Sequence, residues 1–183
     1  MTQKRVLLLH GWGGSDFPHW QSLLASEIAK DYGTVSFLKF SNFDFPDKNI
    51  WKKEALEELS YFKPDIVICH SLATTLWFHL CNEENIKEVE KLFLVAPPSL
   101  ECEIEELKSF FPIDAPKNLR AKEVLLISST NDPYMSPQEA SALQSSLGVE
   151  MEVLKDAGHI NTDSGYGEWS WILQKIITKQ GKQ

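Results

Sequence analysis

Six short runs rich in branched and aromatic apolar residues constrain the fold of this chain more than any other feature of its sequence. Several of them are apolar on consecutive residues, which is typical of strands buried on both faces of a parallel sheet. A strand with one wet face would alternate apolar and polar residues instead. The six runs are Arg5–His10, Thr34–Phe40, Asp65–His70, Lys91–Ala96, Glu123–Ser129 and Glu150–Lys155.

Segments with helical spacing lie between these runs. Apolar residues recur there every three or four positions, which places them along one face of a helix. Strands that alternate with helices predict an α/β fold, with about six mainly parallel strands and helices on both faces of the sheet. The apolar positions are Trp20, Leu23, Leu24 and Ile28; Trp51, Ala55, Leu56 and Leu59; Leu72, Leu76 and Leu80; Ala140, Leu143 and Leu147; and Trp169, Ile172, Leu173 and Ile176.

Two local signals refine this outline. Ser136-Pro137, followed closely by Glu139, predicts a helix start, because serine caps a first turn and proline fits its first position. Pro97–Asn118 holds four of the nine prolines. We expect it to form a surface excursion around a short helix at Glu101–Phe110, too small to be a cap domain.

Length and charge limit the classes of protein. At 183 residues the chain can bury one core but not comfortably two, so we expect a single domain over residues 1–183. The net charge of −8 repels phosphate backbones and anionic lipids, so we expect neither nucleic acid nor a membrane as partner. The first apolar run is shorter than the roughly 7–15 residues of a secretory signal. Three cysteines without CxxC spacing indicate neither disulfides nor zinc, so the sequence predicts a cytoplasmic protein.

Four of the predicted strands are followed by residues that could carry chemistry. Ligands of parallel α/β sheets bind beyond the carboxyl ends of the strands, where these four segments would meet. Each segment alone has an ordinary structural explanation, as a turn, a helix cap or a solvated loop. The four segments are His10-Gly11-Trp12-Gly13-Gly14-Ser15, Cys69-His70-Ser71-Leu72-Ala73, Ser129-Thr130-Asn131-Asp132-Pro133 and Ala157-Gly158-His159-Ile160-Asn161.

Together the four segments predict a catalytic triad. Ser71, Asp132 and His159 supply nucleophile, acid and base in that chain order, each at the end of a strand. His159 would take the serine proton and return it to the leaving group, while Asp132 would fix the imidazole tautomer. The backbone amides of Trp12 and Leu72 would bind the oxyanion, each donor contributing roughly 3–4 kcal/mol. The first loop lacks the lysine of a phosphate-binding P-loop and the spacing of a dinucleotide GxGxxG.

The sequence resembles the small lidless α/β-hydrolases related to retinoblastoma-binding protein 9. The resemblance runs from Arg5 to about Trp171 and implies an α/β-hydrolase fold and an intracellular serine hydrolase, with the triad at Ser71, Asp132 and His159. Cys69 and Ala73 replace the glycines usual around the nucleophile, but both are small. The residues that carry the resemblance are His10-Gly11-Trp12-Gly13-Gly14, Cys69-His70-Ser71-Leu72-Ala73, Ser129-Thr130-Asn131-Asp132-Pro133-Tyr134 and Gly158-His159-Ile160-Asn161 with Ser164-Gly165-Tyr166-Gly167.

The name of this family invites a test for the Leu-x-Cys-x-Glu motif that docks into the retinoblastoma pocket. Leu100-Glu101-Cys102-Glu103-Ile104 has the leucine and the cysteine, but isoleucine stands where the glutamate should be. We therefore do not expect binding to that pocket.

Other candidate residues compete for the catalytic roles. Cys69 beside His70 could act as a thiolate nucleophile, but its place inside the strand end favours a packing role. His10 and His70 could compete with His159 as base, and we favour structural roles for both. His19 and His79 are interpreted as helix-surface or core residues, and no HExxH or similar spacing indicates a metal site.

The sequence thus predicts a serine hydrolase that cleaves a small carboxylic ester or related acyl bond through an acyl-enzyme. A peptidase or amidase with the same triad, and a non-catalytic binding protein on the same fold, stay open as alternatives. We expect a small-molecule acyl substrate, no cofactor and an open cleft; the oligomeric state is not predicted. Five loop aromatics could line an apolar acyl pocket: Trp12, Phe17, Phe43, Phe45 and Tyr134.

Overall fold

A computed structural model of the chain describes residues 3–177. Its centre is a six-stranded sheet in the order β2-β1-β3-β4-β5-β6, in which every neighbouring pair is parallel. The predicted α/β fold is confirmed, and each strand lies within two residues of its predicted limits. The strands are β1 (Lys4–Leu9), β2 (Gly33–Leu38), β3 (Ile66–His70), β4 (Val89–Val95), β5 (Ala121–Ser129) and β6 (Glu150–Leu154).

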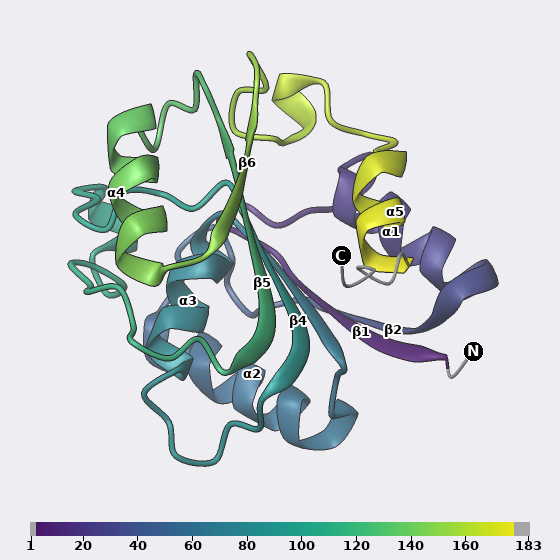
Figure 1. Cartoon of the computed structure of the whole chain (residues 1–183). Coiled ribbons are helices and arrows are strands. Elements are labelled where there is room, and N and C mark those ends of the chain that lie inside the picture. The colour runs from purple at the N-terminus through teal and green to yellow at the C-terminus, as the bar shows by residue number, and fades with distance from the viewer. Residues whose placement is uncertain (1–2, 178–183) are drawn as a thin grey trace.

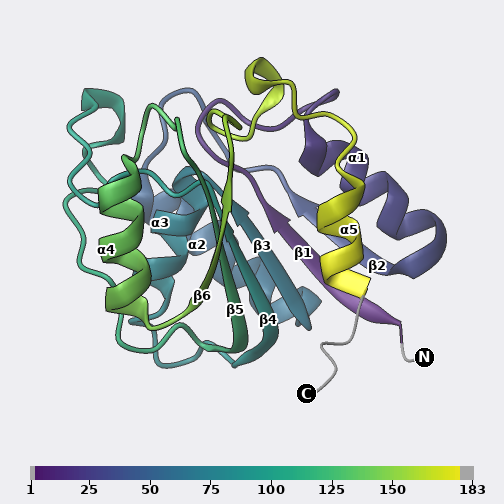
Figure 2. The same cartoon turned by 45° about the horizontal axis from the view of Figure 1, so that its top comes forward.

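Helices cover both faces of this sheet. Figure 1 shows α2, α3 and α4 on one face and α1 and α5 on the other, and the tilted view in Figure 2 agrees. A π-helical turn, Ile28–Tyr32, continues α1 towards β2. Each predicted helical segment corresponds to a helix: α1 (Trp20–Glu27), α2 (Lys48–Phe62), α3 (Leu72–Leu80), α4 (Pro137–Leu147) and α5 (Ser170–Ile177).

The two-sided burial explains why the strands are apolar on consecutive residues. Along β1, Leu7 packs in the core under α2–α4, while Leu8 packs in the core under α1 and α5. Both side chains are completely buried, because successive side chains of a strand point to opposite faces. The central strands can therefore present reactive side chains to a ligand only where the strands end.

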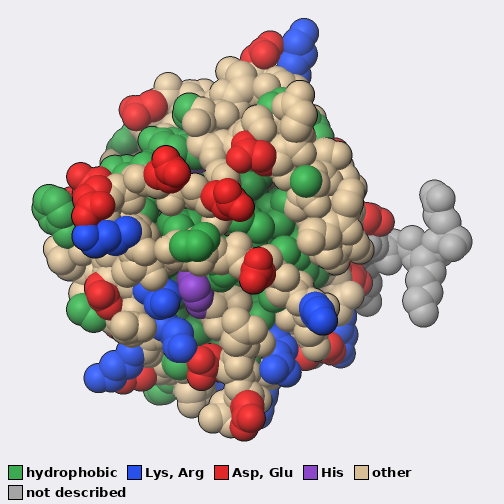
Figure 3. Space-filling view, turned by 90° about the vertical axis from the view of Figure 1, so that its left-hand side faces the viewer, with side chains coloured by type: hydrophobic (Ala, Val, Ile, Leu, Met, Phe, Trp, Pro, Cys, Tyr) green, Lys and Arg blue, Asp and Glu red, His purple; other side chains and the backbone are tan. Residues whose placement is uncertain are grey.

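The excursion at 97–118 differs from its prediction. The expected helix at Glu101–Phe110 reduces to a single 3₁₀ turn, Glu105–Leu107. Leu107 and Phe110, three residues apart, are both buried in the core under α2–α4, a spacing that suits a 3₁₀ turn, and Pro112 cannot continue a helix. Figure 3 shows this side of the molecule, with hydrophobic side chains at its centre and charged side chains of both signs around them.

None of the helices within residues 3–177 is long and apolar enough to cross a membrane.

The start of α4 gives a first test of the structure. Ser136 Oγ accepts the amide N–H of Glu139, and the Glu139 carboxylate accepts the amide of Ser136, so the predicted cap is a reciprocal capping box. We expect Ser136→Ala to lower the free energy of unfolding by about 1 kcal/mol. Urea denaturation would measure it, with Ser141→Ala on the exposed face of the same helix as control. An equal effect of both substitutions would contradict a role for the cap.

Candidate active site

Ser71 occupies a sharp turn between β3 and α3. Its φ of 53° and ψ of −124° lie outside the regions that serine favours, and such strain persists only where the surroundings enforce it. Here the buried β3 and the buried N-terminal turn of α3 enforce it, and the Ser71 amide donates to Val95 O at 2.9 Å. The turn exposes the serine side chain beyond the carboxyl end of the sheet, as expected for a nucleophile elbow.

Gly11 lies against this elbow and has no room for a side chain. A Cβ at Gly11 would lie 2.7 Å from Ser71 Cβ and 3.1 Å from Ser71 Oγ. Both distances are shorter than ordinary van der Waals contact. The glycine in the first loop is therefore needed for close approach to the serine, which is the role that glycines play where backbone meets a reacting group.

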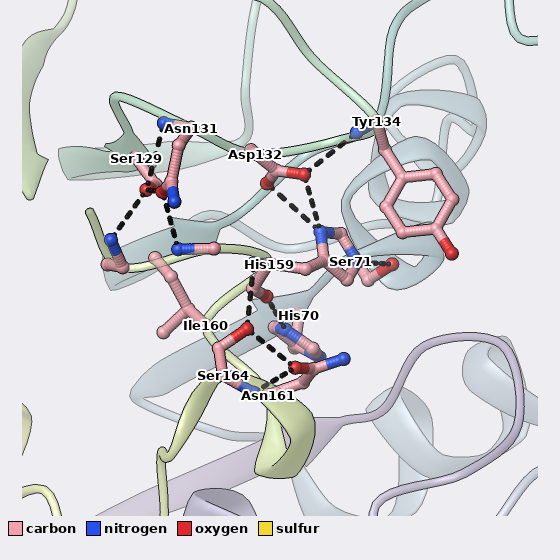
Figure 4. A network of polar contacts seen from close by, with 12 residues as sticks. His70, Ser71, Ser129, Asn131, Asp132, Tyr134, His159, Ile160, Asn161 and Ser164 are labelled. Carbon is pink, nitrogen blue, oxygen red and sulfur yellow. Dashed lines mark hydrogen bonds and ion pairs between the residues drawn. The ribbon is translucent and has the colours of Figure 1, made fainter.

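The structure brings the three predicted triad residues together (Figure 4). His159 Nε2 lies 2.7 Å from Ser71 Oγ, and His159 Nδ1 lies 3.0 Å from both carboxylate oxygens of Asp132. Asp132 and His159 are each only 8% exposed, and Asp132 Oδ1 also accepts the Tyr134 amide at 2.9 Å. A carboxylate can only accept hydrogen bonds, so the neutral imidazole carries its proton on Nδ1 and leaves Nε2 free to receive the proton of Ser71.

The loop that carries His159 is held from three sides. The His159 amide donates to Ser164 Oγ at 3.1 Å, and its carbonyl oxygen lies 3.1 Å from His70 Nε2. The preceding Gly158 donates its amide to Asn131 Oδ1 at 2.7 Å. Asn131 and Ser164 lie in the sequence segments singled out above, but their anchoring roles were not predicted. Asn131 lies 27 residues before Gly158 and Ser164 lies five residues after His159, and neither spacing is a helical or strand pattern that would predict these contacts.

The amides of Trp12 and Leu72 are the predicted oxyanion donors. Among the described residues, neither amide donates a hydrogen bond to a protein acceptor. In the glycine loop, His10–Ser15, the amide of Gly13 that follows Trp12 does donate, to Phe43 O. The indole of Trp12 donates to Asp44 O at 2.9 Å, which holds this loop against the segment after β2. Both candidate donors thus remain available to a ligand beside Ser71.

The competing candidates occupy other positions. Cys69 is completely buried in β3, and burial raises the pKa of its thiol well above the usual value, which disfavours the thiolate. His10 accepts the Phe40 amide at Nε2 and contacts Gly11 O with Nδ1, so it ties the glycine loop to the segment after β2. His79 lies on α3 and contacts Phe110 O. Within residues 3–177, no three histidine, cysteine or carboxylate side chains are grouped to hold a metal ion.

A small cleft of about 180 Å³ opens beside Ser71 and His159. Of the five predicted loop aromatics, only Trp12 lines this cleft. Tyr134 packs edge-on against the ring of His159, with 4.5 Å between the ring centroids. Phe17 and Phe45 are 78% and 67% exposed and do not contribute to the cleft wall. The cleft is lined by Trp12, Gly14, His19, His70, Ser71, His159, Asn161, Thr162 and Asp163.

A larger groove, of about 860 Å³, lies over the opposite ends of β4, β5 and β6. It is lined by residues such as Lys122, Glu123 and Trp171, and none of the four loops described above reaches it. Because that groove holds neither the serine nor the histidine, the smaller cleft is the candidate active site.

Two buried histidines of this site couple stability to pH. Burial, with the neighbouring His159, lowers the pKa of His19 to about 4 and that of His70 well below its usual value. Between pH 6.5 and about 4 the unfolded chain binds a proton at His19 that the folded chain does not. The free energy of unfolding therefore decreases as the pH is lowered through this window. Between pH 7 and pH 4.5 we expect the native chain to lose roughly 2 kcal/mol more of its free energy of unfolding than His19→Asn loses. Urea denaturation at both pH values measures this difference, and equal slopes would contradict it.

Comparison with known proteins agrees with this geometry. Residues 6–177 match the family model described as serine hydrolase, so the chain belongs to the serine hydrolase family. No curated protein gives a significant match.

Several solved structures are similar to this chain over most of its length. A YdeN-like hydrolase from Pectobacterium atrosepticum is 26% identical with a TM-score of 0.77, over 96% of this chain and 89% of that one. The ydeN gene product of B. subtilis is 17% identical with a TM-score of 0.85, over 95% and 97%. An esterase domain of a Rhodothermus marinus protein is 17% identical with a TM-score of 0.65, over 90% and 82%. The predicted α/β-hydrolase fold is confirmed.

Proposed function

We propose that this serine hydrolase cleaves small carboxylic esters through a covalent acyl-enzyme on Ser71. The observation that carries the proposal is the continuous path of hydrogen bonds from Ser71 Oγ through His159 to Asp132. The path joins a strained serine, a buried imidazole and a buried carboxylate, the arrangement that activates a serine hydroxyl. We further propose that the chain is of the lidless type related to retinoblastoma-binding protein 9.

Acylation follows from the positions of these groups. Ser71 Oγ attacks the ester carbonyl carbon while His159 Nε2 takes the serine proton, and Asp132 stabilises the resulting imidazolium. The carbonyl oxygen becomes an oxyanion, which the amides of Trp12 and Leu72 bind. Collapse of this intermediate breaks the bond to the alcohol oxygen, and His159 gives its proton to the departing alcohol.

Deacylation repeats these steps with water. His159 takes a proton from a water molecule while the water oxygen attacks the acyl carbon. His159 then returns a proton to Ser71 Oγ as the carboxylic acid leaves. The cleft volume of about 180 Å³ suits a short acyl group rather than a long chain. The similarity to an esterase domain supports an ester as substrate.

The alternative reactions differ in what His159 must do. Peptide or amide hydrolysis would use the same triad but would require proton donation to the leaving nitrogen, because an amide anion is a much poorer leaving group than an alkoxide. Paired ester and amide substrates with the same acyl group separate these reactions. A binding protein on the same fold would retain ligand affinity without any reaction at Ser71.

Labelling with a fluorophosphonate probe tests the proposal. We expect intact mass to show one adduct on the native chain and none on Ser71→Ala, because only an activated serine attacks the phosphorus. Ser99→Ala, at a half-buried serine whose hydroxyl donates to Glu139, is the matched control and should label like the native chain. A folded native chain without an adduct would overturn the proposed mechanism.

A further inference from the structure

One wall of the cleft carries polar groups that the proposed mechanism does not use. His19, His70 and Asn161 line it beside Ser71 and His159. The ring of His70 lies 5.3 Å from that of His159 and 5.0 Å from that of His19, measured between ring centroids. The wall therefore begins next to the catalytic imidazole and extends away from it.

Backbone contacts fix which nitrogen of each ring carries the proton. His19 Nδ1 accepts the Gln21 amide at 3.1 Å, so in the neutral ring the proton is on Nε2. His70 Nε2 lies 3.1 Å from the carbonyl oxygen of His159, which can only accept, so the proton is on Nε2 and Nδ1 is bare. His19 thus offers a donor and His70 an acceptor.

These groups have no partner within residues 3–177. No described residue hydrogen-bonds to His19 Nε2 or to His70 Nδ1. Asn161 uses its carbonyl oxygen for the amide and hydroxyl of Ser164, while its amide nitrogen has no partner in the described chain. The segment that carries His19 also contains two buried polar atoms without a described partner, Ser15 Oγ and Gln21 Oε1.

The side chains of His19, His70 and Asn161 are also uncharged at pH 7. Burial keeps both rings neutral at pH 7, since the pKa of His19 is lowered to about 4 and that of His70 lies well below its usual value. An unsatisfied polar group in such a place carries a desolvation cost that a complementary ligand would remove. Alkyl groups cannot do so, because they offer neither donor nor acceptor.

We propose that His19, His70 and Asn161 form a subsite for a neutral carboxamide in the acyl part of the substrate. The amide oxygen would accept from His19 Nε2 and the Asn161 amide, and the amide N–H would donate to His70 Nδ1. This inference rests on the proposed function, because it assumes that the acyl group is attached to Ser71 beside this wall. It narrows the substrate class to short acyl groups that carry an amide a few bonds from the ester.

Two ethyl esters of equal size test the subsite. Ethyl succinamate carries the carboxamide, and ethyl 4-methylpentanoate has methyl groups in place of the amide oxygen and nitrogen. We expect the native kcat/KM to be roughly 10- to 100-fold higher for the succinamate, as measured by acid release. In His19→Asn, whose shorter amide can still cap α1, this ratio should fall roughly tenfold. His79→Gln, on α3 outside the cleft, is the control and should keep the native ratio.

A native ratio near one, or an unchanged ratio in folded His19→Asn, would overturn the subsite and leave the wall to water. Failure of the proposed function is distinguishable, because then neither ester is cleaved and the fluorophosphonate probe does not label Ser71. In that case the subsite is judged on Ser71→Ala by NMR of the imidazole nitrogens. Ethyl succinamate should shift the His19 Nε2–H and His70 Nδ1 signals while the alkyl ester does not, and equal responses to both would overturn it.

Discussion

Asp132→Asn is expected to lower kcat for ester hydrolysis roughly 10⁴-fold, since the amide can donate to His159 and hold the imidazole in the wrong tautomer. In the native structure both Asp132 oxygens lie 3.0 Å from His159 Nδ1, which requires the proton on that nitrogen. With the proton on Nε2 instead, the ring has no lone pair to accept the proton of Ser71. Steady-state kinetics with a small ester measures the loss, and fluorophosphonate labelling should slow in parallel.

The control for this substitution is Asp156→Asn. Asp156 is exposed in the neighbouring loop and has a φ of 52°, a conformation that asparagine adopts readily. It makes the same chemical change without touching His159, so kcat should stay within a few-fold of the native value. A loss of less than tenfold in Asp132→Asn would show that Asp132 does not orient the base.

Gly11→Ala is expected to lower kcat/KM roughly 10²- to 10³-fold, the effect of losing one oxyanion donor. The new methyl group would lie 2.7 Å from Ser71 Cβ and 3.2 Å from His70 O, so either the glycine loop or the elbow must move. Movement of the loop carries the Trp12 amide away from the oxyanion position. Movement of the elbow displaces Ser71 Oγ from His159.

Gly13→Asn, in the same loop, separates this steric effect from a general effect on the loop. Gly13 has a φ of 77°, which asparagine tolerates better than most residues, and a Cβ there would meet nothing within 4 Å. We expect it to stay within a few-fold of the native kcat/KM. Circular dichroism and thermal unfolding confirm that both variants fold, and near-native activity of folded Gly11→Ala would contradict the close approach inferred here.

Much of the fold could be predicted because its signals are local. Consecutive apolar residues in β1 and β3 indicate burial on both faces, and Ser136-Pro137 marks the start of α4 within the sequence itself. The predicted helix at Glu101–Phe110 was wrong, because apolar spacing there reflects how Leu107 and Phe110 reach the core rather than a regular helix.

The sequence by itself determined the sheet, the order of its chemical residues and their place at strand ends, because strand periodicity and chain order are properties of neighbouring residues. Only the tertiary structure decided which groups meet. His70 donates to the carbonyl of His159 across 89 residues of chain, and Gly158 donates to Asn131 across 27. Such contacts depend on how separate loops pack over the sheet, so no local pattern encodes them. The tautomer of His70 follows from that packing, whereas the tautomer of His19 follows from its local contact with the Gln21 amide at the start of α1.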